Sequence, residues 1–140
     1  MVASDKTSGT LRAVTGSTTV LVATDSDQLH SEVEAALDGD HQILRIRTGY
    51  EVLHAVKTHQ PAVVVLDLQI GNMGGMAACL DLRLEQRAGR ISTQRVVMLL
   101  DREADVFLGR HSEADAWLVK PINPLALRRT INGVLANQPV

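Results

Sequence analysis

Short apolar runs alternate with amphipathic segments along most of the chain, and this alternation limits the possible folds more than any other feature. A run too short for a helix predicts a buried strand, and strands that alternate with helical segments predict a parallel α/β sheet. Three of the five runs are almost wholly apolar, as expected for strands that helices cover on both faces. The runs are residues 20–23, 43–46, 62–66, 96–100 and 117–119.

Apolar residues recur at helical spacing between and after these runs, which predicts helices with one buried face. Thr48 followed by Glu51 resembles a capping box at the start of the second helix. Asn123 as cap and Pro124 at the first helical position open the last helix. The segment 102–112 predicts a helix least clearly, because its apolar residues adjoin one another. The expected inward residues are Leu29, Val33, Ala36 and Leu37; Val52, Leu53 and Val56; Met76, Cys79, Leu80 and Leu84; and Leu127, Ile131, Val134 and Leu135.

Five strands that alternate with about five helices predict one α/β domain with a doubly wound, flavodoxin-like parallel sheet. Right-handed crossovers and a domain of this size favour the strand order 2-1-3-4-5. Residues 1–18 are rich in Ser, Thr and Gly and have no apolar period. We therefore expect a flexible leader at 1–18 and an ordered domain at 19–137. Since no further domain follows the last helix, we expect a stand-alone protein.

Composition argues against several classes of function. The chain has 140 residues, a net charge of −2 and only 2% aromatic residues, so direct nucleic-acid binding is not expected. The single cysteine, Cys79, cannot form an internal disulfide and is expected to be a small buried side chain. The histidines lack metal-ligand spacing. No apolar run is long enough to span a membrane and no signal peptide precedes the domain, so we expect a cytoplasmic location.

Charged residues follow most of the runs, at the edge of a parallel sheet where ligands bind. Asp25 follows the first run, Asp67 the third, Asp101 and Arg102 the fourth, and Lys120 the fifth. If the first and third strands are neighbours, the two carboxylates face each other and Lys120 approaches from the far side. Two such carboxylates favour a hard divalent cation such as Mg²⁺. A carboxylate beside Mg²⁺ and an ammonium group can attack phosphorus and form an aspartyl phosphate.

Each of these residues also has a purely structural interpretation. Asp25 or Asp27 could cap the following helix, Asp67 could belong to a turn, and Lys120 could be solvated. The glycine-rich stretch 71–75 does not have the spacing of a phosphate-binding loop, and we interpret it as a flexible loop. The occurrence of two acids and a lysine at the same edge of successive strands favours the functional interpretation.

Four blocks of the sequence resemble the receiver domain of two-component response regulators (CheY-like), and the resemblance covers residues 19–136. By this resemblance Asp67 is the phospho-acceptor, and Lys120 contacts the phosphoryl oxygens. The resemblance also implies that Mg²⁺ is bound by Asp25, Asp67 and the backbone carbonyl of Gln69, and that the peptide bond between Lys120 and Pro121 is cis. The blocks are VLVATDSDQL at 20–29, VVVLDLQIGNMGGM at 63–76, VVMLLD at 96–101 and EADAWLVKPINPLAL at 113–127.

The chain departs from the family pattern in ways that make it an atypical member. Thr24 replaces an acid, which removes a negative charge and predicts weak Mg²⁺ binding. Leu100 replaces the Ser or Thr whose hydroxyl binds the phosphoryl group, and Trp117 replaces the switch Tyr or Phe. The stretch from Leu100 to Trp117 is about two residues short, and Gly71 replaces a common proline. Trp117 either fills an apolar gap beside a short helix or belongs to a partner surface.

The resemblance implies a receiver that is phosphorylated on Asp67 by a histidine kinase or a phosphotransfer protein. We expect no enzymatic activity beyond its own phosphorylation and dephosphorylation, and no membrane partner. Its output would be a protein-binding surface formed by the fourth helix, fifth strand and fifth helix, where the family often dimerises. Thr24 and Leu100 leave open a receiver that binds a protein partner without phosphorylation. A phosphohydrolase is less favoured because Gln69 lacks an acid group, and a flavodoxin-like cofactor binder is disfavoured by the few aromatic residues.

Overall fold

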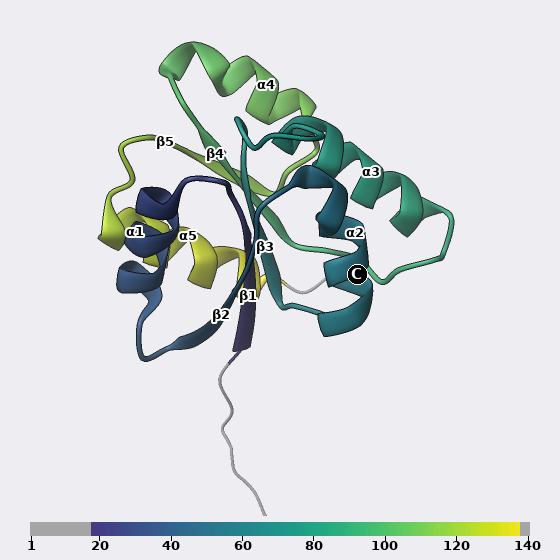
Figure 1. Cartoon of the computed structure of the whole chain (residues 1–140), viewed down its shortest axis with the longest axis horizontal. Helices are drawn as coiled ribbons and strands as arrows, with labels where there is room; N and C mark the ends of the chain where they lie inside the picture. Colours follow the sequence, from purple (N-terminus) through teal and green to yellow (C-terminus); the bar gives the residue numbers. More distant parts are fainter. Residues whose placement is uncertain (1–17, 138–140) are drawn as a thin grey trace, which may run out of the picture.

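The computed structural model describes residues 18–137. Five parallel strands form one sheet in the order β2-β1-β3-β4-β5, which confirms the predicted fold class and strand order (Figure 1). Every strand lies within two residues of its predicted bounds at both ends. The strands are β1 (Thr18–Ala23), β2 (His41–Ile46), β3 (Val63–Asp67), β4 (Val96–Leu100) and β5 (Ala116–Val119).

Helices connect the strands and cover both faces of the sheet. The helix α1 (Asp27–Leu37) and the helix α5 (Pro124–Ala136) lie on one face, and three further helices lie on the other (Figure 1). No helix among the described residues is long and apolar enough to cross a membrane. The predicted leader lies outside these residues except for Thr18, which begins β1. The three helices of the second face are α2 (Val52–His59), α3 (Gly75–Arg87) and α4 (Val106–His111), and 3-10 turns at Gly49–Glu51 and Glu103–Asp105 precede α2 and α4.

Alternate residues of the central strands enter two separate cores, because successive side chains of a strand point to opposite faces. Val20 and Val22 of β1 pack with residues of α1 and α5. Leu21 and Ala23 pack with residues of α2 and α3. All residues of β3 and β4 are buried, whereas those of β2 are at least partly exposed, as the arginine in its apolar run predicted for a strand at the sheet edge.

The face that α3 buries differs from the predicted one. Leu80 and Leu84 are 37% and 61% exposed, although their spacing predicted that they face inward. The cause is Arg83, whose guanidinium donates to the carbonyl oxygen of Gln94 at 2.7 Å and to Asp115 Oδ2 at 3.0 Å. These bonds turn the arginine side of the helix toward the sheet. The buried residues of α3 are Gly75, Ala78, Cys79, Leu82 and Arg83.

The predicted helix caps differ in outcome. The Asn123 side chain accepts a hydrogen bond from the backbone N–H of Ala126, and Pro124 opens α5, as predicted. The predicted capping box at Thr48 is wrong. Its hydroxyl donates to Glu51 Oε2 at 2.9 Å and no backbone N–H donates to it, so this segment starts as a 3-10 turn.

Candidate functional site

The register of the sheet places an acid and a hydroxyl side by side at its carboxyl edge. β1 and β3 are neighbours, and Ala23 of β1 pairs with Leu66 of β3. The next residue of each chain segment, Thr24 and Asp67, therefore lies at the same level. Both are buried, with 0% and 3% of their surface exposed.

The carboxylate of Asp67 accepts three hydrogen bonds from the protein. Lys120 Nζ donates to Oδ1 at 2.7 Å, and the backbone N–H of Gln69 donates to the same oxygen at 3.1 Å. The Thr24 hydroxyl donates to Oδ2 at 2.7 Å. A carboxylate oxygen offers about two acceptor positions, so Oδ2 keeps one of them for another group.

Asp25 lies on the loop between β1 and α1 and reaches the loop that follows β3. Its Oδ2 accepts a hydrogen bond from the backbone N–H of Gly71 at 3.2 Å. It does not cap α1, because Ser26 holds the N-cap position and its hydroxyl accepts from the backbone N–H of Leu29. Asp27 does not cap the helix either but lies in its first turn. The helix-cap interpretation of either acid is therefore wrong.

The oxygen atoms at this edge suit a magnesium ion. Asp25 and Asp67 supply two carboxylates, and the backbone carbonyl of Gln69 belongs to the turn that closes on Asp67. Asp67 Oδ2 accepts from Thr24, the residue that precedes Asp25 in the chain. Mg²⁺ binds through one or two carboxylates and keeps several waters, so this set is sufficient. No three His, Cys, Asp or Glu side chains of residues 18–137 gather into a metal site of their own.

Lys120 is not a free surface lysine, because its ammonium group joins two carboxylates. Nζ lies 2.7 Å from Asp67 Oδ1 and 2.7 Å from Asp101 Oδ1. Burial lowers the pKa of Lys120, but the hydrogen bonds to Asp101 and Asp67 outweigh it, so the pKa lies above its ordinary value. The backbone N–H donates to the carbonyl of Leu100 at 2.8 Å and holds the ends of β4 and β5 together. The peptide bond to Pro121 is cis.

Leu100 and Trp117 meet beneath α4. Leu100 is fully buried and Trp117 is half-buried. A Cβ atom at Gly109 of α4 would lie 3.1 Å from Trp117 Cγ and 3.2 Å from Leu100 Cδ1. The helix therefore packs directly on both side chains, and its small residue makes room for the indole ring. This packing agrees with the interpretation of Trp117 as a side chain that fills the gap beside a short helix.

Comparison with known proteins identifies the family. Residues 20–132 match the response regulator receiver domain. The chain belongs to this family. Receiver domains are signalling modules of two-component systems, which agrees with the expectation that the chain is not an ordinary enzyme.

Relatives and solved structures agree with this assignment. Protein PilH of Pseudomonas aeruginosa is 28% identical over 118 residues, which are 84% of this chain and 97% of PilH. The chain spans about half the length of several transcriptional regulatory proteins that it also matches. The chemotaxis response regulator CheY4 of Vibrio cholerae shares the fold, with a TM-score of 0.74, 24% identity and coverage of 85% of this chain and 99% of CheY4.

A second structural relative carries the ion that the resemblance implies. The receiver domain of sensor histidine kinase PA1611 from Pseudomonas aeruginosa has a magnesium ion coordinated in its active site cleft. It aligns with a TM-score of 0.76 and 14% identity over 87% of this chain and 100% of that domain. At this identity the likeness shows a shared fold.

Three residues of the receiver site have roles that their sequence positions do not reveal. Thr24 is expected from the sequence only as a lost acid, whereas its hydroxyl binds Asp67. Asp101 gives no signal beyond its place after the fourth strand. Gly75 is not a flexible-loop residue but the first residue of α3, and a Cβ atom there would lie 2.5 Å from the carbonyl oxygen of Asp67. The start of α3 can therefore approach the backbone of Asp67 only with glycine.

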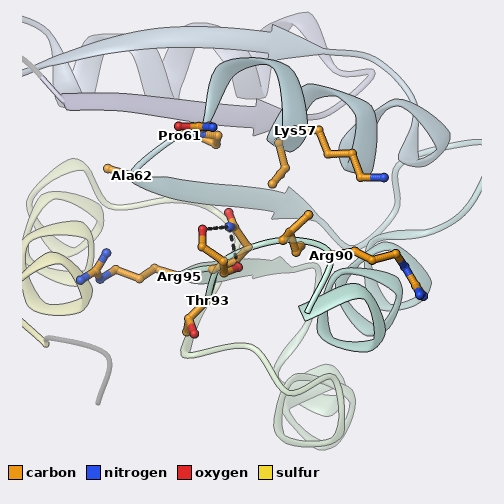
Figure 2. A pocket seen from close by; sticks show the side chains of 11 residues that line it. Lys57, Pro61, Ala62, Arg90, Thr93 and Arg95 are labelled. Atoms are coloured by element: carbon orange, nitrogen blue, oxygen red, sulfur yellow. Dashed lines mark hydrogen bonds between the residues drawn. The ribbon is translucent and has the colours of Figure 1, made fainter. Parts of the chain in front are cut away.

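Two hollows lie on the receiver surface, at opposite edges of the sheet. One of about 570 Å³ opens at the amino ends of β3 and β4, where Arg90 and Arg95 extend in opposite directions (Figure 2). Lys57 and Arg90 both pair with Glu85, at 3.8 and 2.8 Å, so this one carboxylate offsets one of their two positive charges. None of the predicted site residues lines it. The other, of about 380 Å³, lies beside the predicted site, between α1 and Lys120.

Proposed function

We propose that this receiver domain accepts a phosphoryl group on Asp67 from a histidine kinase or a phosphotransfer protein. The observation that carries the proposal is the buried carboxylate of Asp67, with Lys120 Nζ 2.7 Å from Oδ1 and a free acceptor position on Oδ2. A carboxylate oxygen forms the bond to phosphorus, while the bond between phosphorus and the donor nitrogen breaks and the imidazole keeps the electron pair. Lys120 neutralises charge on the transferred group, which is the main requirement of phosphoryl transfer.

We assign the magnesium site of the proposed reaction to Asp25, Asp67 and the backbone carbonyl of Gln69. When bound, the ion neutralises charge on the phosphoryl oxygens. Thr24 brings a hydroxyl where a carboxylate would add a negative charge, and this hydroxyl already uses part of Asp67 Oδ2. We therefore expect weak Mg²⁺ binding, because the affinity of such sites increases with the number of charged ligands.

The hollow beside Lys120 offers a phosphoryl donor a place to dock next to the site. It is lined by α1 residues such as Gln28 and Glu32 and by Pro121. A protein that carries a phosphohistidine can place its surface against α1 there and direct the phosphoryl group at Asp67. This supports a protein donor, although a small donor can dock at the same place.

Phosphorylation with a small-molecule donor tests the proposal. The intact mass of the chain is measured after incubation with acetyl phosphate and Mg²⁺. We expect the wild type to gain one phosphoryl group that hydroxylamine removes, and Asp67→Asn to gain none. Asp38→Asn, which changes an exposed acid outside the site, should behave as the wild type does. An equal gain by Asp67→Asn, or no gain by the wild type, would contradict the proposal.

We place the output of the receiver on the face formed by α4, β5 and α5. Phe107 of α4 is 65% exposed and Leu125 of α5 is 51% exposed, and half-buried Trp117 belongs to the strand between these helices. Exposed aromatic and aliphatic side chains of this kind supply the anchors of protein interfaces. A second copy of the chain or a downstream protein is the partner that we propose for this face.

The packing of Trp117 favours a second function, a receiver that binds its partner without phosphorylation. Leu100 has no hydroxyl to move toward a phosphoryl group, and α4 packs on the indole ring of Trp117 through Gly109. Sedimentation equilibrium distinguishes the two functions. Self-association that requires Mg²⁺ and beryllofluoride supports the phosphorylated form, whereas equal association of the wild type and Asp67→Asn supports the second function. Association that Phe107→Ala does not weaken would contradict the proposed face.

A further inference from the structure

Asp101 is a third acid at the receiver site, and it comes from a strand other than those of the predicted metal ligands. Leu100 pairs with Val119 across β4 and β5, so the next residues, Asp101 and Lys120, are neighbours. Asp101 Oδ1 accepts from Lys120 Nζ at 2.7 Å, the same distance that separates Nζ from Asp67 Oδ1. One ammonium group is therefore shared between two carboxylates.

The other oxygen of Asp101 has no partner. Among residues 18–137, Oδ2 of Asp101 is one of two buried polar side-chain atoms without a hydrogen bond. A buried acceptor that lacks a donor destabilises the charged group that carries it. Lys120 is the only cationic group paired with Asp101 in this part of the chain. The negative charge of Asp101 consequently depends on the same ammonium group that the Asp67 site uses.

We propose that Asp101 lowers the affinity of the Asp67 site for a phosphoryl group by competing for Lys120. The inference rests on the proposed function of Asp67. A phosphoryl group carries about two negative charges at neutral pH, in place of the one carried by the free carboxylate, and so increases the demand on the ammonium group. Asp101 accepts a hydrogen bond from the Lys120 ammonium group and so reduces what that group can offer the phosphoryl oxygens. It also places a second negative charge beside Lys120. It acts through Lys120 and is a positioning residue.

Calorimetric titration of the full chain with beryllofluoride, in excess Mg²⁺, measures this competition because the anion is an analogue of the bound phosphoryl group. Asp101→Asn keeps the shape and one acceptor oxygen but removes the charge. We expect it to bind roughly tenfold more tightly than the wild type, which corresponds to about 1.4 kcal/mol. Asp101→Glu restores the charge and should return the affinity toward that of the wild type, which separates the effect of charge from that of packing.

Glu103→Gln is the matched control. It removes a negative charge from an exposed side chain two residues away, and its affinity should equal that of the wild type. A gain by Glu103→Gln as large as that of Asp101→Asn would overturn the inference, because net charge alone would then explain the effect.

The remaining outcomes separate this inference from the proposed function. Binding by the wild type with equal or weaker binding by Asp101→Asn overturns the role of Asp101 and leaves the proposed function intact. If only Asp101→Asn binds beryllofluoride, the competition of Asp101 for Lys120 is strong enough to prevent binding by the wild type. Failure of both proteins to bind, with no phosphoryl gain on Asp67, contradicts the proposed function and this inference with it.

Discussion

Different kinds of side chain surround the two sides of the carboxyl edge of the sheet. On the acceptor side, formed by the ends of β1 and β3, polar groups converge on one buried carboxylate. On the packing side, formed by β4, β5 and α4, apolar side chains fill the space beneath a short helix. The acceptor side comprises Thr24, Asp25 and Asp67, and the packing side comprises Leu100, Gly109 and Trp117.

The proposed acceptance of a phosphoryl group and the movement of an output face therefore make separate demands on the fold. The acceptor side requires oxygen atoms and an ammonium group, and Asp67, Asp25 and Lys120 carry these groups. The packing side needs a group that changes position, and Leu100 offers none. Lys120 is the polar link between the two sides, since it binds Asp67 and also Asp101 at the end of β4.

Truncation of the packing side should have the largest effect on stability. Leu100 is fully buried, and Leu100→Ala leaves a cavity under α4. We expect the free energy of unfolding in urea to fall by about 2–5 kcal/mol. Leu84→Ala, which changes a leucine that is 61% exposed, should change it by less than about 0.5 kcal/mol. Equal effects of the two substitutions would show that Leu100 does not support the helix.

Removal of the Thr24 hydroxyl should have the next largest effect on the free energy of unfolding. Thr24→Val keeps the shape but removes the donor to Asp67 Oδ2. Because hydrogen bonds to charged groups contribute about 1.5–3 kcal/mol, we expect the unfolding free energy to fall by that amount. Thr93→Val changes an exposed threonine and serves as the control. A Thr24→Val protein as stable as the wild type would mean that the hydroxyl adds nothing to the acceptor side.

Substitution of Gly75 and of Gly109 by alanine compares how tightly the acceptor side and the packing side are packed. At Gly75 the added Cβ meets the carbonyl oxygen of Asp67 at 2.5 Å, and this backbone atom cannot give way. We expect Gly75→Ala to lower the unfolding free energy by about 1–3 kcal/mol. At Gly109 the Cβ meets the Trp117 ring at 3.1 Å, so a smaller loss should accompany a change in tryptophan emission. An unchanged emission spectrum of Gly109→Ala would contradict the packing of Trp117 on α4.

The smallest expected effect concerns the single cysteine, which lies in the core under α3. Burial raises the pKa of the Cys79 thiol from its ordinary value of 9.0 to about 11. The folded chain therefore holds this proton more tightly than the unfolded chain does. The resulting stabilisation is present below about pH 9 and is lost as the pH rises toward about 11.

Thiol labelling at pH 8 measures how well the fold covers Cys79, because the reagent reaches the thiol only when the structure opens. The labelling rate should be far below that of the urea-unfolded chain. Destabilisation by Leu100→Ala should increase it. Labelling of the native protein as fast as that of the unfolded chain would show that α3 does not cover the thiol.

Backbone topology and the position of the site could be predicted from the sequence. Strands buried on both faces read as continuous apolar runs, and β4 begins and ends where its run does. Because parallel strands end at one edge, the residues after each run were enough to bring Asp25, Asp67 and Lys120 together. The blocks that resemble receiver domains indicate the same three residues independently.

Side-chain partners could not be predicted in this way, because they depend on residues far apart in the chain. Arg83 is buried by its bonds to the carbonyl of Gln94 and to Asp115, and these bonds expose Leu84 against its helical spacing. Asp101 finds Lys120 across 19 positions of the chain, through the register of two strands. Such contacts are set by tertiary packing and leave no local pattern.

The amide NMR spectrum of the chain with Mg²⁺ and beryllofluoride tests whether Asp67 is the phospho-acceptor. The backbone N–H groups of Gln69 and Gly71 donate to Asp67 and Asp25, so their resonances report on both acids. We expect these two resonances to shift at saturation, and the resonances of the Gly109 amide and the Trp117 indole to shift much less. Asp67→Asn should abolish the response. Unchanged Gln69 and Gly71 resonances at saturating ligand would contradict the assignment of Asp67 as the phospho-acceptor.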